Sequence, residues 1–309
     1  MTFLDDVKAE VHEAGIDSAV ALGHTPPVFD WLLSTFSLQG ISDRVAREYM
    51  DKHGTASWAE MEASLMASSS CPRLRSYWTY AACQYKKSSF SCSEPEHINR
   101  CPVPIPRLRN GRLNQTAYAL FLFVRDIAGG DLVGWIDGQL EAAVGSPVAD
   151  LEAARQEALI GPLRNVYGVS DKVLTMALSS LLMGARGGRS VWFETGKAMM
   201  AIDTLVHNFL HRTGILEGCG TLHAYGAACY ARGGCADVIK GVATRIDARS
   251  LNPRFPEKFP RFVQHAIWRY CAADGLNICN GNRIQDNRAC ENRYCYLFRG
   301  CGRKQLKSA

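Results

Sequence analysis

The sequence predicts an all-α protein, and three features of it support this fold class. Apolar residues recur at helical spacing in many segments. No segment alternates apolar and polar residues in the way that a half-buried strand would. Glycine- and proline-rich breaks separate the helical segments. With 309 residues and 47% hydrophobic content, the chain can bury the core of one large or two ordinary domains.

The first third begins with helices. Residues 4–14 have an amphipathic helical pattern, and Thr25-Pro26-Pro27 separates them from an apolar helix over 28–35. A further helix is expected over 50–66. The helical periodicity then stops until 112.

Residues 68–112 differ in composition from the rest of the chain, because serine, proline, cysteine, arginine and aromatic residues replace the helical pattern. Cys101-Pro102-Val103-Pro104-Ile105-Pro106 cannot be helical. Aromatic residues interleave with basic ones at Tyr77, Trp78, Tyr80, Tyr85, Arg75, Lys86 and Lys87. This mixture suits stacking on bases and pairing with phosphates. A small local core is the alternative explanation of the aromatic residues.

Helical patterns resume over 114–128 and 131–143, and Ser146-Pro147 is a good start for the next helix. That helix is expected to end near Tyr167. A tight turn over 168–171 then leads into a second helix that begins at Lys172. Such a turn presents backbone N–H groups at a helix N-terminus, where a phosphate of nucleic acid can bind.

The last third predicts shorter helices. One follows Asp203 and runs to about Thr213, residues 218–234 form loops or short turns, and helices follow over 236–248 and 262–273. The last of these leads into a cysteine-rich loop.

The hairpin resembles that of the helix-hairpin-helix DNA glycosylases of the endonuclease III type. Their signature Leu-Pro-Gly-Val-Gly-x-Lys is followed by a helix that starts Val-Asp-Thr-x-Val. The matching segments here are Val166-Tyr167-Gly168-Val169-Ser170-Asp171-Lys172 and Ile202-Asp203-Thr204-Leu205-Val206. Tyr167 and Ser170 stand where the family has proline and glycine, and Asp171 adds a negative charge beside the expected phosphate site.

The resemblance implies site residues and a reaction. Lys172 matches the family's nucleophilic lysine, Asp203 its catalytic aspartate, and Gly168, Val169 and Ser170 its DNA-binding turn. The implied activity is removal of a damaged or modified base from double-stranded DNA, with strand cleavage through a Lys172 Schiff base. The target base is left open.

Upstream, Ser37-Leu38-Gln39-Gly40-Ile41-Ser42-Asp43 resembles the family's Ser-Ala-Gln-Ala-Thr-Asp motif. The resemblance implies that Gln39 fills the gap left by the extruded nucleotide. An ordinary loop residue is the alternative interpretation.

The implied architecture has two helical lobes. A helical barrel would span 27–201, with an insertion at 68–112, and a second lobe would combine 1–26 with 202–309. Further insertions are expected at 185–198 and 217–235.

Twelve cysteines in a chain without a secretion signal indicate metal binding rather than disulfides. Cys279, Cys290, Cys295 and Cys301 are the expected ligands. The resemblance implies a [4Fe-4S] cluster for them, with zinc as the alternative and Cys271 as a substitute ligand. Two other groups could hold zinc, although free thiols explain them equally well: Cys71, Cys83, Cys92, His97 and Cys101, and Cys219, His223, Cys229 and Cys235.

The net charge of +5 does not by itself indicate a nucleic-acid partner. Two regions are locally basic: residues 71–112 contain eight Lys/Arg against two acids, and residues 279–309 contain seven against two. We expect these to flank the hairpin as a phosphate track. No membrane span or signal peptide is predicted, so an intracellular monomer is expected.

Two other functions remain open. The first is a monofunctional glycosylase in which Asp203 activates water and Lys172 only binds phosphate. The second is a DNA-binding protein that keeps the hairpin without catalysis, in which the metal supports the architecture.

Overall fold

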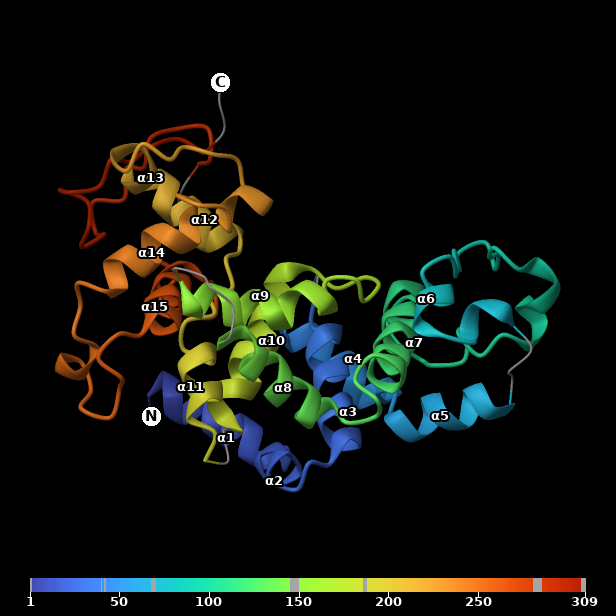
Figure 1. The fold of residues 1–309 in the computed structure, drawn as a ribbon. Helices are drawn as coiled ribbons and strands as arrows, with labels where there is room; N and C mark the ends of the chain where they lie inside the picture. The colour runs from blue at the N-terminus through green and yellow to red at the C-terminus, as the bar shows by residue number, and fades with distance from the viewer. Residues whose placement is uncertain are drawn as a thin grey trace. The chain divides into compact units, whose positions relative to one another are not determined.

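The computed structural model describes residues 2–39, 41, 43–67, 71–144, 150–185, 188–279 and 285–306. Within these ranges the regular structure is helical, and the nearest approach to a sheet is an isolated bridge between Lys86 and Ser91 (Figure 1). The all-α prediction is therefore confirmed. The chain divides into unit 1, Met1–Gly196, and unit 2, Lys197–Ala309.

Unit 1 begins with α1 (Phe3–Glu13), α2 (Ile16–Ala21) and α3 (Thr25–Ser37). Thr2 caps α1 through a reciprocal bond pattern with Asp5. Helix α1 packs directly on α10 (Asp171–Gly184), where a Cβ atom at Gly184 would lie 2.4 Å from Val11 Cγ2. Residues 2–26 thus belong to unit 1. The expectation that 1–26 joins the second lobe was wrong, because the apolar face of α1 has its partner on the hairpin helix.

The helix expected over 50–66 is two helices, α4 (Asp43–His53) and α5 (Trp58–Ala67). Gly54 separates them in the left-handed conformation, with φ of +80°. The backbone N–H of Trp58 then donates to the Asp30 carboxylate at 2.6 Å, which fixes the start of α5.

Residues 71–110 contain only the short helices η1 (Pro72–Leu74), α6 (Tyr77–Tyr80) and η2 (Pro95–Arg100), as the composition predicts. This insertion is attached to α7 (Gly111–Asp126), beside which α6 lies (Figure 1). Asn114 Nδ2 donates to the carbonyl of Val103, and Tyr118 Oη donates to that of Pro102. From Leu113 to Val124 every side chain of α7 is buried, so α7 is a central helix of unit 1.

Unit 1 continues with α8 (Leu132–Val144), α9 (Leu151–Leu163), α10 and α11 (Ser190–Gly196). The helix start predicted at Ser146-Pro147 lies outside the described residues. Helix α9 as described begins after Asp150, whose carboxylate accepts from the N–H of Ala153.

Unit 2 contains α12 (Thr204–Arg212), α13 (Ile215–Gly218), η3 (Ala227–Cys229), α14 (Cys235–Ala243), η4 (Ala248–Ser250) and α15 (Pro260–Cys271). Helices α12 and α14 both pack on α15 around a core that includes Ile202, Val206, Leu210 and Ile239. Helix α14 ends five residues before the predicted Ala248. Among the described helices of either unit, none combines the length and the apolar character needed to cross a membrane.

Candidate functional site

The predicted hairpin is present between α9 and α10 and packs closely on α7. Gly168 adopts φ of +82°, which favours glycine, and the carbonyl of Tyr167 accepts from Thr116 Oγ1 at 2.8 Å. A Cβ atom at position 168 would lie 2.7 Å from the same Oγ1. The turn therefore needs glycine for both its conformation and its packing.

The negative charge of Asp171, at the start of α10, is paired. Arg164 Nε lies 3.1 Å from both carboxylate oxygens of Asp171, and its Nη1 donates to Glu157 at 2.9 Å. The hydrogen bonds to Glu157 and then to Asp171 raise the pKa of Arg164 above its ordinary value. Arg164 thus pairs with Asp171 beside the N-terminus of α10, but it shares its single positive charge with Glu157.

Gln39 lies just beyond the C-terminus of α3 and is joined to the segment that leads into α7. Arg109 Nη2 donates to the backbone carbonyl of Gln39 at 2.6 Å. Tyr49 Oη makes a second link to this segment, by donating to the carbonyl of Arg107 at 3.3 Å. The side chain of Gln39 is half-buried.

Basic side chains gather at the same end of α7. The exposed Arg112 places its Nε 3.3 Å from the position that a Cβ of Gly168 would occupy. Lys87 is also exposed and lies against Gly111, the first residue of α7. A Cβ atom added at Gly111 would be 2.6 Å from the Cβ of Lys87. We call Arg109, Arg112, Lys87, Gln39 and the hairpin the α7-end surface. Four of the predicted DNA-binding residues, Gln39, Gly168, Val169 and Ser170, belong to it.

The two predicted catalytic residues, Lys172 and Asp203, lie in different units. That their side chains share one active site stays a prediction. Lys172 is half-buried in the first turn of α10. Asp203 is the N-cap of α12 and accepts from the N–H of Val206 at 2.9 Å. Asp203 also interacts with Arg261: burial lowers the pKa of Arg261 to about 10, and the charge of Asp203 opposes that shift.

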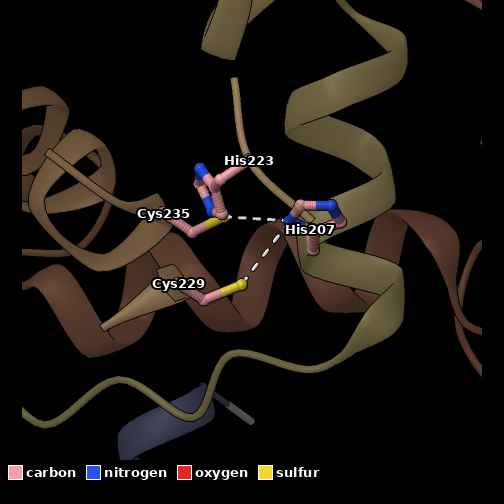
Figure 2. A group of neighbouring side chains, drawn as sticks. All are labelled: His207, His223, Cys229 and Cys235. Atoms are coloured by element: carbon pink, nitrogen blue, oxygen red, sulfur yellow. Dashed lines mark hydrogen bonds between the residues drawn. The ribbon is translucent and has the colours of Figure 1, made fainter. Parts of the chain in front are cut away.

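A tightly grouped set of potential metal ligands lies in the core of unit 2. The ligand atoms of His207, His223, Cys229 and Cys235 all lie within 4.8 Å of one another (Figure 2). His207 Nδ1 is 3.3 Å from Cys235 Sγ and 3.5 Å from Cys229 Sγ, and His223 Nε2 is 3.4 Å from Cys235 Sγ. Tetrahedral ligands at ordinary zinc–ligand distances stand roughly 3.5 Å apart, so this group can hold one metal ion.

The local structure explains how these four side chains meet. His207 is on the buried face of α12, and Cys235 is the first residue of α14. His223 Nδ1 contacts the carbonyl of Thr221 at 2.6 Å, which directs its Nε2 toward Cys235. Gly234 has no room for a side chain, because a Cβ there would be 2.2 Å from the carbonyl oxygen of Ala228.

The two thiols of this group, Cys229 and Cys235, interact through a hydrogen bond. Hydrogen bonding from Cys235 and then from His207 lowers the pKa of Cys229, although burial opposes this, whereas the same bond to Cys229 and burial raise the pKa of Cys235. One thiolate is thus stabilised before any metal binds. The sequence placed Cys219 in this group instead of His207. Cys219 is exposed and lies outside the group, and His207 was missed because nothing in its local spacing marks a ligand.

The C-terminal cysteines are drawn together by backbone bonds to α12. Gly302 N–H donates to the carbonyl of Thr213 and Lys304 N–H to that of Arg212, both at 2.8 Å. Burial raises the pKa of the Cys301 thiol, and the neighbouring thiols raise it further. Those neighbours are Cys279, Cys290 and Cys295. Within the described ranges, however, the group whose ligand atoms lie close enough to hold one metal ion is that of His207, His223, Cys229 and Cys235 and includes none of these four cysteines. Their shared metal therefore stays a prediction.

Arg212 supplies a buried positive charge beside these thiols. Its side chain is 1% exposed, and its Nη1 has no hydrogen-bond partner among the described residues. It lowers the pKa of Cys279, although the bond from Cys271 is the larger cause. Its Nη2 donates to the Asp286 carboxylate at 3.3 Å, so the charge of Arg212 already has a carboxylate partner. Cys271, the substitute ligand considered from the sequence, lies next to Cys279.

The cysteines of the insertion also lie near one another. Burial raises the pKa of Cys83 and of Cys101 to about 11, and the thiols of Cys71 and Cys92 add to both shifts. His97 pairs instead with Glu96, at 3.5 Å. Zinc was one expectation for this group, but its members, all of them described, are not among the side chains that lie close enough to hold a metal ion.

No family model matches the chain, and neither the curated proteins nor the solved structures contain a similar one.

Proposed function

We propose that this protein is a DNA N-glycosylase with AP-lyase activity that binds DNA through the α7-end surface. The observation that carries the proposal is that the hairpin packs on the first turns of α7, while Arg109, just before α7, donates to the backbone carbonyl of Gln39. Each of the two proposed DNA-binding motifs is thereby tied to the start of α7 or to the segment that leads into it.

The phosphate of the DNA backbone would bind at the hairpin. The first amides of α10 have no intrahelical acceptors, and the helix dipole adds partial positive charge there. Arg112 adds a full charge beside Gly168, and Arg164 pairs with Asp171. Lys87 and Arg109 extend the positive charge, which would release counterions on binding.

The proposed chemistry uses Lys172 and Asp203. The neutral Lys172 amine attacks C1′ of an extruded nucleotide, the C1′–N bond breaks, and the base departs with a proton. The Lys172 nitrogen loses its proton and the sugar ring opens to an imine, which acidifies the 2′ hydrogens. Loss of one of these expels the 3′ phosphate by β-elimination. The Asp203 carboxylate stabilises positive charge on the sugar and moves protons.

We further propose that Cys279, Cys290, Cys295 and Cys301 hold a [4Fe-4S] cluster, with zinc as the alternative for this loop. The cluster would cross-link a loop that contains little regular structure. We propose zinc for the group of His207, His223, Cys229 and Cys235, because two neutral imidazoles and two thiolates are its preferred donors. Both metals would support unit 2 rather than take part in the reaction.

A non-catalytic DNA-binding protein is the second candidate, and one observation favours it. Asp203 caps α12, and after Tyr230 it helps to oppose the lowering of the Arg261 pKa by burial. These structural roles give a reason for an aspartate at this position without catalysis. A monofunctional glycosylase, in which Asp203 activates water, is an intermediate case.

A duplex that contains one abasic site tests the proposal without knowledge of the target base. The protein is incubated with this duplex and borohydride, and covalent products are resolved by denaturing electrophoresis. A lyase is expected to give a reduced protein–DNA adduct that Lys172→Ala abolishes. Lys197→Ala is the matched control, because Lys197 lies outside the hairpin.

The outcomes separate the candidates. An adduct that persists in Lys172→Ala contradicts the assigned nucleophile. Absence of an adduct, together with release of a base from a panel of modified duplexes, indicates the monofunctional enzyme. Binding with neither product indicates the non-catalytic protein.

A further inference from the structure

A cavity of about 370 Å³ lies between the insertion and the hairpin in unit 1. Tyr80, Tyr85 and Lys86 line it from the insertion, Gln115 from α7, and Tyr167 from the hairpin. The cavity therefore joins the aromatic and basic segment of the sequence to the expected phosphate-binding turn. No part of the glycosylase motifs requires it.

Gln115 is the polar group at the inner side of this cavity. Its residue is 3% exposed, and its backbone carbonyl accepts from Tyr80 Oη at 3.1 Å. Within the described part of the chain its side-chain amide has no hydrogen-bond partner, yet the amide is not fully enclosed by protein atoms. The amide is thus available to a ligand in the cavity.

The walls of the cavity are aromatic. Tyr80 and Tyr85 are each 4% exposed. Burial raises the pKa of both, so that both phenols are neutral at pH 7. Only a small part of each tyrosine faces the cavity, and Ala81, Cys83 and Gln84 complete its wall. Uncharged aromatic groups beside a primary amide favour a planar heteroaromatic ring over a charged ligand.

The mouth of the cavity differs from its interior. Tyr167 is 44% exposed there and Lys86 is also exposed, and the next residue of the hairpin, Gly168, lies against Arg112. Positive charge thus lies outside and neutral aromatic surface inside. A ligand that matches both has a planar ring attached to an anionic backbone.

We propose that this cavity binds one unpaired nucleobase of a DNA strand whose phosphate lies at the hairpin. The Gln115 amide offers one donor and one acceptor, which match the N6/N7 edge of adenine. Tyr167, at the position where the related motif has proline, stacks on the base at the mouth. This inference rests on the proposed DNA binding, but not on the reaction at Lys172.

The test measures binding of a labelled duplex with a single bulged adenine and of the same duplex fully paired. Fluorescence anisotropy gives both dissociation constants for the wild-type protein. We expect the bulged duplex to bind about tenfold more tightly. Gln115→Leu, which keeps the volume and removes the amide, should lose this preference and retain its affinity for the paired duplex. Gln139→Leu on α8 is the matched control and should retain both.

A second variant guards against misfolding of Gln115→Leu. Tyr167→Ala changes an exposed side chain, and it should also reduce the preference for the bulge. Equal binding of both duplexes by the wild-type protein, or an unchanged preference in both variants, overturns the cavity assignment and leaves the proposed enzyme standing. A bulge preference without borohydride trapping on abasic DNA overturns the lyase and leaves the cavity assignment standing.

Discussion

Replacing Cys229 with serine should release metal from the group of His207, His223, Cys229 and Cys235 and destabilise unit 2. Cys229 and Cys235 are both 0% exposed and lie in the core of that unit. A metal present at roughly a thousand times its dissociation constant stabilises the folded state by about 4 kcal/mol. Cys229→Ser should lose most of this stabilisation by the metal, and it also leaves a buried hydroxyl group. At roughly 4 °C per kcal/mol for a unit of this size, Tm should fall by about 15 °C.

Metal content by mass spectrometry and Tm by scanning calorimetry check this prediction together. Cys219→Ser is the matched control, since Cys219 is an exposed thiol outside the group. A chelator should lower the Tm of the wild type and of the control, with little further effect on Cys229→Ser. If Cys229→Ser keeps one zinc ion at this group and the wild-type Tm, the argument from ligand proximity is wrong.

Three further predictions concern single side chains. Asp203→Asn keeps an N-cap and removes the charge, so trapping on abasic DNA should slow about a hundredfold, and Tm should also fall because the buried Arg261 loses a negative neighbour; equal trapping rates would contradict the assigned role. Gly168→Ala should weaken binding to paired duplex and lower Tm, because a methyl group at φ of +82° meets Thr116. An unchanged dissociation constant for the duplex would contradict the role of this turn in DNA binding, and an unchanged Tm would contradict its close packing. Burial lowers the pKa of His265 to about 4 from 6.5, so the unfolded chain binds the extra proton between these values and stability should fall as pH drops through them. Urea unfolding should show a shallower fall for His265→Gln; equal slopes would contradict this.

The helical class could be predicted from the sequence because it depends on local patterns. The proline-rich stretch of the insertion and the helix after Asp203 are where those patterns place them. The split at Gly54 was missed although it has local signs: Gly54 is followed by Ser57, which forms reciprocal bonds with Glu60 at the start of α5. The assignment of α1 was wrong for a different reason: its partner, α10, is distant in sequence, and the contact of Val11 with Gly184 leaves no local sign.

In the candidate site, too, the features that depend on local sequence could be predicted, and those that depend on distant contacts could not. The hairpin could be located because its turn requires a left-handed glycine, which is a local demand. That Gln39 and Gly168 are each tied to the start of α7 or to the segment that leads into it could not be predicted, since α7 was only an apolar helix in the sequence. His207 was missed because its three companions come from two loops and a helix start, and its spacing to them has no regular form.

Duplex binding as a function of salt tests the α7-end surface most directly. Wild-type protein should bind paired duplex with an affinity that falls linearly on a logarithmic salt scale, and Arg112→Ala should reduce that slope by about one. Arg44→Ala on α4, an exposed arginine paired with Glu48, should leave the slope unchanged. No binding at low salt, or the same slope in wild type and Arg112→Ala, would contradict the assignment of this surface to DNA.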